Sequence, residues 1–198
     1  MIDKTDQLFL RGQLLVASPG IGDERFSRTV IYLCAHSVEG AMGLIVNKPA
    51  DEIKFSDLLQ QLNLLPKSED IQIPPNIREM TVLRGGPVET SRGFVLHATD
   101  ARRDYGSVAV SDHVRLSASI EILQAIAKGQ GPDEAVFALG YAGWSAGQLE
   151  NELGDNGWIL CPARHDILFD RDHETKYARA LSLIGVDPAM LSSVAGHA

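Results

Sequence analysis

The sequence predicts an α/β protein built on a mixed sheet. Short, apolar and partly β-branched runs outnumber the helix-like segments, and several of them follow one another directly along the chain. The helical patterns do not alternate regularly with the strands, which favours a mixed sheet over a doubly wound parallel one. The 198 residues, 44% of them hydrophobic, are enough for one core without a disulfide or a metal.

The strands are predicted from apolar runs that are bounded by glycine-rich or polar turns. We expect them over residues 13–17, 29–35, 42–46, 80–83, 93–98, 107–110, 113–116, 135–141, 158–161 and 167–169.

The helices are predicted from apolar positions at helical spacing and from capping residues. Gly129, for example, follows one such pattern at the position where glycine often ends a helix. We expect helices over residues 56–62, 117–128, 145–153 and 172–184, and a last short one that begins at Asp187. Three prolines between residues 65 and 76 predict a loop. We therefore expect one domain over residues 1–198, with a mobile excursion or subdomain around residues 50–80.

The formal net charge of −8 argues against a nucleic-acid-binding protein. Phosphate contacts need a basic surface, and neither half of this chain is basic. Cys34 and Cys161 each lie in an apolar run and lack metal-ligand spacing, so we expect two buried thiols, no metal and no cofactor. The first residues lack an apolar segment, and no apolar run is long enough for a bilayer, which predicts a cytoplasmic protein without a membrane partner.

One motif resembles the nucleophile turn of serine hydrolases. Residues 143–147 read Gly-Trp-Ser-Ala-Gly between a predicted strand and a predicted helix, and Asp155 and His165 follow in the order of a catalytic triad. The alternative is a capping box, because Ser145 precedes Gln148 by three residues. We favour the capping box, since no spacing directs Asp155 or His165 toward Ser145.

Two glycine-containing turns invite a phosphate- or anion-binding interpretation. Gly20-Ile21-Gly22 follows a predicted strand, but Arg25 replaces the third glycine of a dinucleotide-binding motif and no helix follows, so we reject it. In residues 84–87, Arg-Gly-Gly-Pro, the glycine N–H groups could converge on an anion beside Arg84, and the alternative is a tight turn. We expect such an anion cleft to lie beside Asn47 and His97.

The chain resembles the AlgH/YqgE family along nearly its whole length. The segments that carry the resemblance are Gly12–Ala17 with Asp23 and Phe26, His36, Gly40–Pro49, Gly85–Val88, Arg92–His97, Gly140–Trp144, Gly147–Glu150, Leu153, Trp158 and Gly196–Ala198. The resemblance implies a bacterial fold with a barrel-like mixed sheet, peripheral helices and a smaller α/β portion. It implies no reaction and no catalytic residues, although the family carries the label of transcriptional regulators.

The function expected from these observations is that of a non-enzymatic binding or regulatory protein, whose partner is a small anionic ligand or another protein. The alternatives are a serine hydrolase that uses Ser145 and a nucleic-acid-binding regulator. The candidate ligand-binding residues are polar, aromatic or glycine residues within the matching segments or directly beside them: Asn47, Arg84, Gly85, Gly86, His97, Trp144, Gln148 and Glu150.

Overall fold

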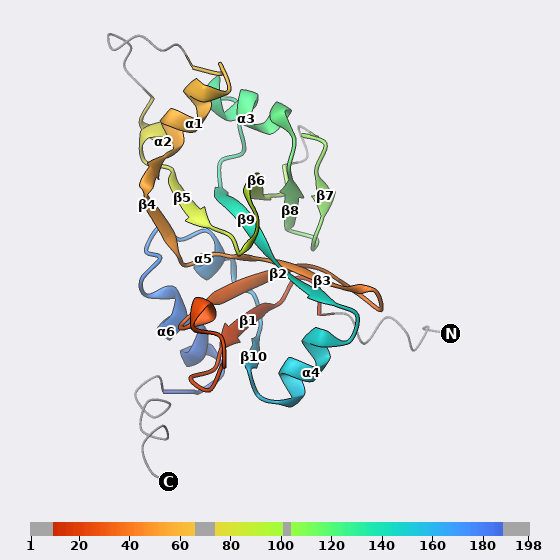
Figure 1. The fold of residues 1–198 in the computed structure, drawn as a ribbon. Coiled ribbons are helices and arrows are strands. Elements are labelled where there is room, and N and C mark those ends of the chain that lie inside the picture. The colour runs from red at the N-terminus through yellow and green to blue at the C-terminus, as the bar shows by residue number, and fades with distance from the viewer. Residues whose placement is uncertain (1–9, 66–73, 101–103, 188–198) are drawn as a thin grey trace.

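The computed structural model describes residues 10–65, 74–100 and 104–187 (Figure 1). The strands are β1 (Leu14–Ala17), β2 (Val30–Ser37), β3 (Gly40–Ile45), β4 (Pro49–Lys54), β5 (Thr81–Arg84), β6 (Val88–Ala98), β7 (Val108–Ala109), β8 (Val114–Ser117), β9 (Ala135–Ser145) and β10 (Trp158–Cys161). The helices are α1 (Phe55–Gln61), α2 (Pro75–Arg78), α3 (Ile120–Ala127), α4 (Gln148–Gly154), α5 (His165–Leu168) and α6 (Lys176–Leu183), and a 3-10 turn covers Glu24–Phe26.

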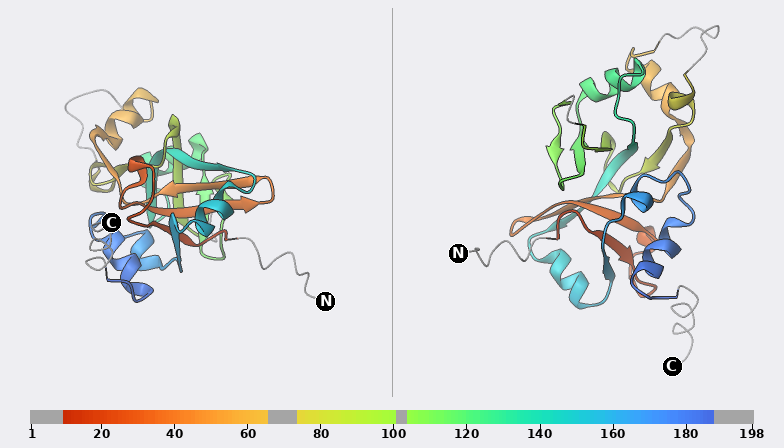
Figure 2. Two further views of the ribbon diagram at one scale, coloured as in Figure 1. Left: turned by 60° about the horizontal axis from the view of Figure 1, so that its bottom comes forward. Right: turned by 180° about the vertical axis from the view of Figure 1, so that it is seen from behind.

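Strand β9 joins the two parts of the sheet. The strand order is β10-β1-β2-β3-β9-β6-β8-β7, and β5 pairs in parallel with the first half of β9 and antiparallel with β4. In Figure 1, β9 runs from the part that holds α1, α2 and α3 into the part that holds α4, α5 and α6. The two further views in Figure 2 show the same division, with the sheet curled between the two groups of helices.

Glycines allow the chain to cross closely over the middle of β9. Gly140 has a φ of 72°, and a Cβ there would overlap the Gly86 carbonyl. A Cβ on Gly86 would in turn overlap the backbone of Tyr141. Only glycine can occupy such positions without displacing the neighbouring strand.

The core forms three clusters around the curled sheet. The interior of the curl holds, among others, Leu14, Val16, Tyr32, Leu44 and Leu96. A second cluster packs α1 and α3 against the outer face of β5, β6 and β9, through Phe55, Leu59, Ile122, Ile126 and Phe137. The third packs α4 against β1, β2, β3 and β10 through Leu15, Ile31, Trp144, Leu149 and Trp158.

The structure confirms the mixed α/β class and most of the predicted elements, with the following corrections. The loop expected up to residue 76 ends before Pro75, where helix α2 begins. Residues 167–169 were expected as a strand, but Ile167 and Leu168 lie in α5 and bury their side chains. Strand β4 was not expected, because its sequence contains proline and charged residues. Strand β9 continues to Ser145, so the helix expected over 145–153 begins only at Gln148.

Some of the predicted elements lie partly outside the described residues. Part of the loop expected between residues 65 and 76, and nearly all of the helix expected from Asp187, lie outside them. Between residues 50 and 80, the described part forms β4, α1 and α2. The single domain over 1–198 stays a prediction. In the described part of the chain, no helix has the length and apolar character that a membrane span requires.

Candidate functional site

A large cavity lies at the open end of the sheet interior, and we call it the barrel mouth. It has a volume of about 900 Å³. The hairpin of β2 and β3 forms one wall, β6, β7 and β8 contribute another, and the second half of β9 lies between them. The partly buried side chains of Met42, Leu116 and Tyr141 line it and pack against the interior core. The mouths of curled sheets are common ligand sites.

Alternation along β6 places a cation beside the apolar lining of the mouth. Arg92 and Phe94 are two residues apart and therefore project from the same face of the strand. The Arg92 guanidinium lies 5.2 Å from the centroid of the Phe94 ring, and that ring meets Tyr141 edge-on at 5.8 Å. Arg92 also donates to Glu89 at 3.0 Å, and both side chains are largely exposed. Apart from Arg92, the charged lining among the described residues is Glu39.

Trp144 separates the mouth from a second cavity of about 590 Å³, which we call the loop cleft. The loop cleft lies between the 20–26 segment and α4. The Glu152 carboxylate organises it, since one oxygen accepts from the indole N–H groups of Trp144 at 2.8 Å and Trp158 at 2.7 Å, and the other from the Gln148 amide at 2.9 Å. These bonds fix the wall that the two cavities share.

Two of the candidate residues from the sequence lie in this wall, and the other candidates lie elsewhere. Trp144 lines both cavities and Gln148 lines the loop cleft. Glu150 instead pairs with His36 Nε2 at 2.7 Å, while His36 Nδ1 accepts from the Leu10 N–H, which fixes the Nε2–H tautomer.

Asn47 makes two bonds to the backbone of a neighbouring turn. Its Oδ1 accepts from the Val30 N–H at 2.8 Å and its Nδ2 donates to the Arg28 carbonyl at 2.9 Å. Its amide therefore supports the start of β2.

The Arg84-Gly85-Gly86 segment does not present converging N–H groups. The Gly85 N–H donates to the Leu139 carbonyl at 2.7 Å, and Gly86 provides the close crossing over β9. Arg84 extends outward and pairs with Glu52 at 2.6 Å. The segment is therefore a close crossing between β5 and β6 that backbone bonds to neighbouring strands hold in place.

His97 is fully buried and lies in the outer core, away from the mouth. Its Nδ1 donates to the Ala98 carbonyl at 3.0 Å, and its ring meets Tyr105 edge-on at 5.5 Å. Burial lowers the pKa of His97, so the neutral form is favoured.

The structure separates the residues of the hydrolase alternative. Ser145 is the last residue of β9, paired with Gly40, and does not occupy a turn between strand and helix. His165 pairs with Glu134, which directly precedes the other end of β9. At about 3.3 Å per strand residue, the two ends of β9 lie roughly 30 Å apart.

The capping box is half confirmed. The Gln148 side chain accepts from the Ser145 N–H at 3.0 Å, as expected, but the N-cap residue of α4 is Gly147 in a left-handed conformation.

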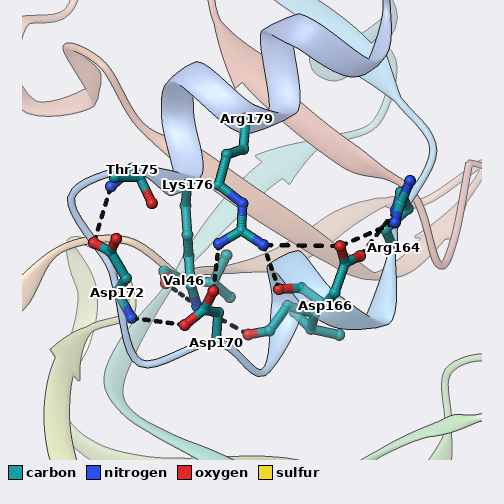
Figure 3. Close-up of polar contacts among 9 residues, drawn as sticks. Val46, Arg164, Asp166, Asp170, Asp172, Thr175, Lys176 and Arg179 are labelled. Atoms are coloured by element: carbon teal, nitrogen blue, oxygen red, sulfur yellow. Dashed lines mark hydrogen bonds and ion pairs between the residues drawn. The ribbon is translucent and has the colours of Figure 1, made fainter.

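A dense polar cluster joins α5 to α6, and we call it the helix clamp (Figure 3). Lys176 is fully buried, and its ammonium donates to the carbonyls of Val46 at 3.1 Å and Leu168 at 2.9 Å. Arg179 bonds the Asp170 carboxylate and the Asp166 carbonyl. Burial lowers the pKa of Lys176 to about 8. The hollow beside Asp170 has a volume of only about 40 Å³, so the helix clamp is a structural junction.

The two cysteines and the possible metal ligands bear on whether the protein could hold a metal or another cofactor. Cys34 and Cys161 are buried free thiols, as predicted, and burial raises the pKa of Cys34 to about 12. Within residues 10–65, 74–100 and 104–187, no group of three or more His, Cys, Asp or Glu residues is arranged to hold a metal ion.

Comparison with known proteins reveals close relatives along the chain. Residues 14–189 match the family model described as DUF179, AlgH-like. A UPF0301 protein of Nitrobacter hamburgensis is 55% identical, over 98% of this chain and 89% of its own length. A UPF0301 protein of Methylobacterium nodulans is 57% identical, over 96% of this chain and 90% of its own.

Two solved structures share the fold. The solution structure of AlgH from Pseudomonas aeruginosa has a TM-score of 0.75 and 39% identity, and the match covers 96% of this chain and 97% of that one. The crystal structure of DIP2367 from Corynebacterium diphtheriae has a TM-score of 0.66 at 18% identity, covers 94% and 91% of the two chains, and supports the fold alone. The names of these relatives state no reaction and no ligand.

Proposed function

This chain belongs to the AlgH-like family, and we propose that it is a binding protein whose ligand is a small organic acid held in the barrel mouth. The observation that carries the proposal is the combination of a large, mainly apolar cavity with one arginine at its rim. Binding sites for small molecules are typically apolar cavities with a few placed polar groups. The mouth of the curled sheet has this composition.

Arg92 supports an acid as the ligand. Its guanidinium can hold a carboxylate through two parallel bonds, and the Phe94 ring beneath it limits its orientations. The pairing of Arg92 with Glu89 is solvent-exposed, and exposed pairs contribute only about 0–1 kcal/mol. A ligand carboxylate can therefore replace Glu89 at little cost. The anionic ligand expected from the sequence is kept, but its proposed partner changes from Arg84 to Arg92.

Binding without catalysis is the simpler function for this site. Ser145 lines the mouth, yet its hydroxyl has no histidine partner among the described hydrogen bonds. The two histidines nearest in the sheet are engaged elsewhere, since His36 pairs with Glu150 and His97 is buried in the outer core. A nucleophilic serine needs a base within hydrogen-bond reach.

A regulatory role in the cytoplasm fits such a binding protein. The net charge of −8 disfavours contact with a nucleic acid, so a regulator with this sequence acts through another protein. In this proposal, occupancy of the mouth is the signal that the protein partner detects.

The experiment compares two arginines that are similarly exposed and similarly paired but lie in different places. Arg84 and Arg92 are both largely exposed, and each pairs with one glutamate. We would titrate small mono- and dicarboxylates into wild type, Arg92→Gln and Arg84→Gln, and follow backbone amide shifts at Gly93 and Tyr141. Loss of a charge-assisted pair should weaken binding by at least about tenfold in Arg92→Gln and leave Arg84→Gln unchanged.

The two variants also distinguish the alternatives. If no carboxylate binds wild type, the proposal is wrong. If Arg84→Gln abolishes binding while Arg92→Gln preserves it, the anion site lies at residues 84–86, as the sequence suggested.

A further inference from the structure

A third cavity adjoins the barrel mouth, on the side of α1 and α3. It has a volume of about 360 Å³, and we call it the acyl slot. The acyl slot and the barrel mouth share Arg92, Ala118 and Ser119 in their linings, so the two cavities adjoin beside the part of β6 that carries Arg92. The Arg92 guanidinium lies over Phe94, on the mouth side of the strand.

The acyl slot is lined mainly by aliphatic and aromatic carbon. Its walls come from α1 and α3, and its floor from β6 and β9; the apolar lining residues are Leu58, Leu62, Val95, Ile120, Leu123, Phe137 and Leu139. Arg92 is the one charged side chain among the described residues that line it. The floor is closely packed at Gly93, where a Cβ would lie 3.0 Å from the Phe137 ring.

Two of these apolar side chains are unusually exposed. Leu62 is 48% exposed at the end of α1, and Ile120 is 43% exposed at the start of α3. They stand on opposite helices of the same slot. Exposed apolar side chains that are scattered singly need no explanation, but two that flank one cavity indicate a surface that an apolar group covers.

We propose that the ligand of the barrel mouth is an acyl carboxylate, with its carboxylate on Arg92 and its alkyl chain in the acyl slot. This inference rests on the proposed function and specifies its ligand class. The charge of Arg92 selects the carboxylate, and the mainly apolar lining suits an alkyl chain. In the complex, the alkyl chain covers Leu62 and Ile120.

The alkyl chain has a measurable consequence for affinity. Full burial of one methylene group strengthens binding by about fourfold, and a partly open slot gives less. Affinity should therefore increase stepwise with chain length, until the chain extends beyond the slot. A chain that lay in the barrel mouth instead would show the same trend, so the two locations must be separated by substitutions.

The experiment is a titration of butanoate, hexanoate, octanoate and decanoate, each below its micelle concentration, into the full chain. The variants are Leu62→Gln and Ile120→Gln in the slot, Arg92→Gln at its entrance, and Leu183→Gln as a control. Leu183 is 38% exposed on α6, outside both cavities. Amide spectra of each variant verify that the fold is retained.

We expect wild type and Leu183→Gln to bind decanoate at least tenfold more tightly than butanoate. Leu62→Gln and Ile120→Gln should lose most of that difference while butanoate binding stays unchanged. Arg92→Gln should weaken every acid by a similar factor.

Three outcomes would contradict the proposal in different ways. If no acid binds, both the proposed function and the acyl slot are wrong. If the acids depend on Arg92 but not on chain length, or if Leu62→Gln and Ile120→Gln leave the length dependence intact, the proposed function stands and the acyl slot is wrong. If Arg92→Gln binds every acid as tightly as wild type does, the acids adsorb to apolar surface and the shared arginine has no role.

Discussion

The helix clamp and the barrel mouth both contain arginine and carboxylate side chains. The helix clamp adjoins only a small hollow, whereas the barrel mouth is a large cavity. In the helix clamp, Arg179 bonds Asp170 and Asp166 and the buried Lys176 bonds two carbonyls, beside a hollow of about 40 Å³. In the barrel mouth, Arg92 has one exposed glutamate partner beside a cavity of about 900 Å³.

The two regions differ in how far their hydrogen-bond donors and acceptors are already paired within the protein. A network whose donors and acceptors are already paired has little capacity left for a ligand, and it contributes to stability instead. An arginine with one weak partner next to apolar surface retains that capacity. Stability measurements should therefore respond to the helix clamp, and binding measurements to the barrel mouth.

The largest expected effect is that of Lys176→Ala in the helix clamp. The substitution removes the buried four-carbon side chain of Lys176. It also removes the ammonium group that donates hydrogen bonds to the carbonyls of Val46 and Leu168. We expect a loss of about 2–5 kcal/mol in the free energy of unfolding, measured by urea denaturation. Lys128→Ala, at an exposed lysine that ends α3, is the control and should cost less than about 0.5 kcal/mol. Equal effects would mean that the helix clamp contributes no special stability.

The pH dependence of stability tests the same lysine. Burial lowers the pKa of Lys176 to about 8 from the ordinary lysine value of 10.5, with Asp170 and Asp172 favouring the charged form and Arg179 opposing it. Between these two pH values the unfolded chain binds more protons at this site than the folded chain, so the contribution of Lys176 to stability rises with pH. Measured against Lys176→Met, that contribution should grow by up to about 3 kcal/mol from pH 8 to pH 10.5. A constant difference between the two proteins would show that Lys176 titrates normally.

Substitutions in the barrel mouth should have a smaller effect on stability. Arg92→Gln removes an exposed ion pair and one contact with the Phe94 ring. We expect the free energy of unfolding to change by less than about 1 kcal/mol, while acid binding is lost. A loss as large as that of Lys176→Ala would remove the contrast between the two regions and assign Arg92 a structural role.

The smallest effect is expected for Ser145→Ala. Ser145 is exposed, and the bond that joins β9 to α4 uses its backbone N–H, which alanine retains. Stability should change by less than about 0.5 kcal/mol. A fluorophosphonate probe, followed by mass spectrometry, should leave wild-type Ser145 unlabelled. Labelling at Ser145 would revive the hydrolase alternative and contradict a purely binding role.

Much of the candidate site was beyond sequence reasoning. Trp144 and Gln148, two of the candidate ligand-binding residues, lie in the cavity wall, but Glu152, which accepts hydrogen bonds from both, was not among the candidates. Its spacing of four residues from Gln148 on a helix was the available signal. Arg92 lies in a segment that carries the family resemblance, and its alternation with Phe94 was the signal for a shared face.

Local sequence patterns predicted those features that depend on interactions between neighbouring residues. Periodic apolar runs located most strands and helices, the acidic composition disfavoured nucleic acid, and the contact between Ser145 and Gln148 followed from their spacing of three. Each of these depends on interactions within a few residues, which local patterns encode.

Other features depend on contacts between segments that are distant in the sequence, and these contacts are seen only in the folded protein. Strand β4 forms because β5 pairs with it, and the buried Lys176 donates a hydrogen bond to the carbonyl of Val46, 130 residues away. The curl of the sheet around β9 brings the β2–β3 hairpin opposite β6 and so creates the barrel mouth. The physical reason is that a residue's local pattern fixes the face on which its side chain lies, whereas the curl and packing of the whole sheet fix what that face meets.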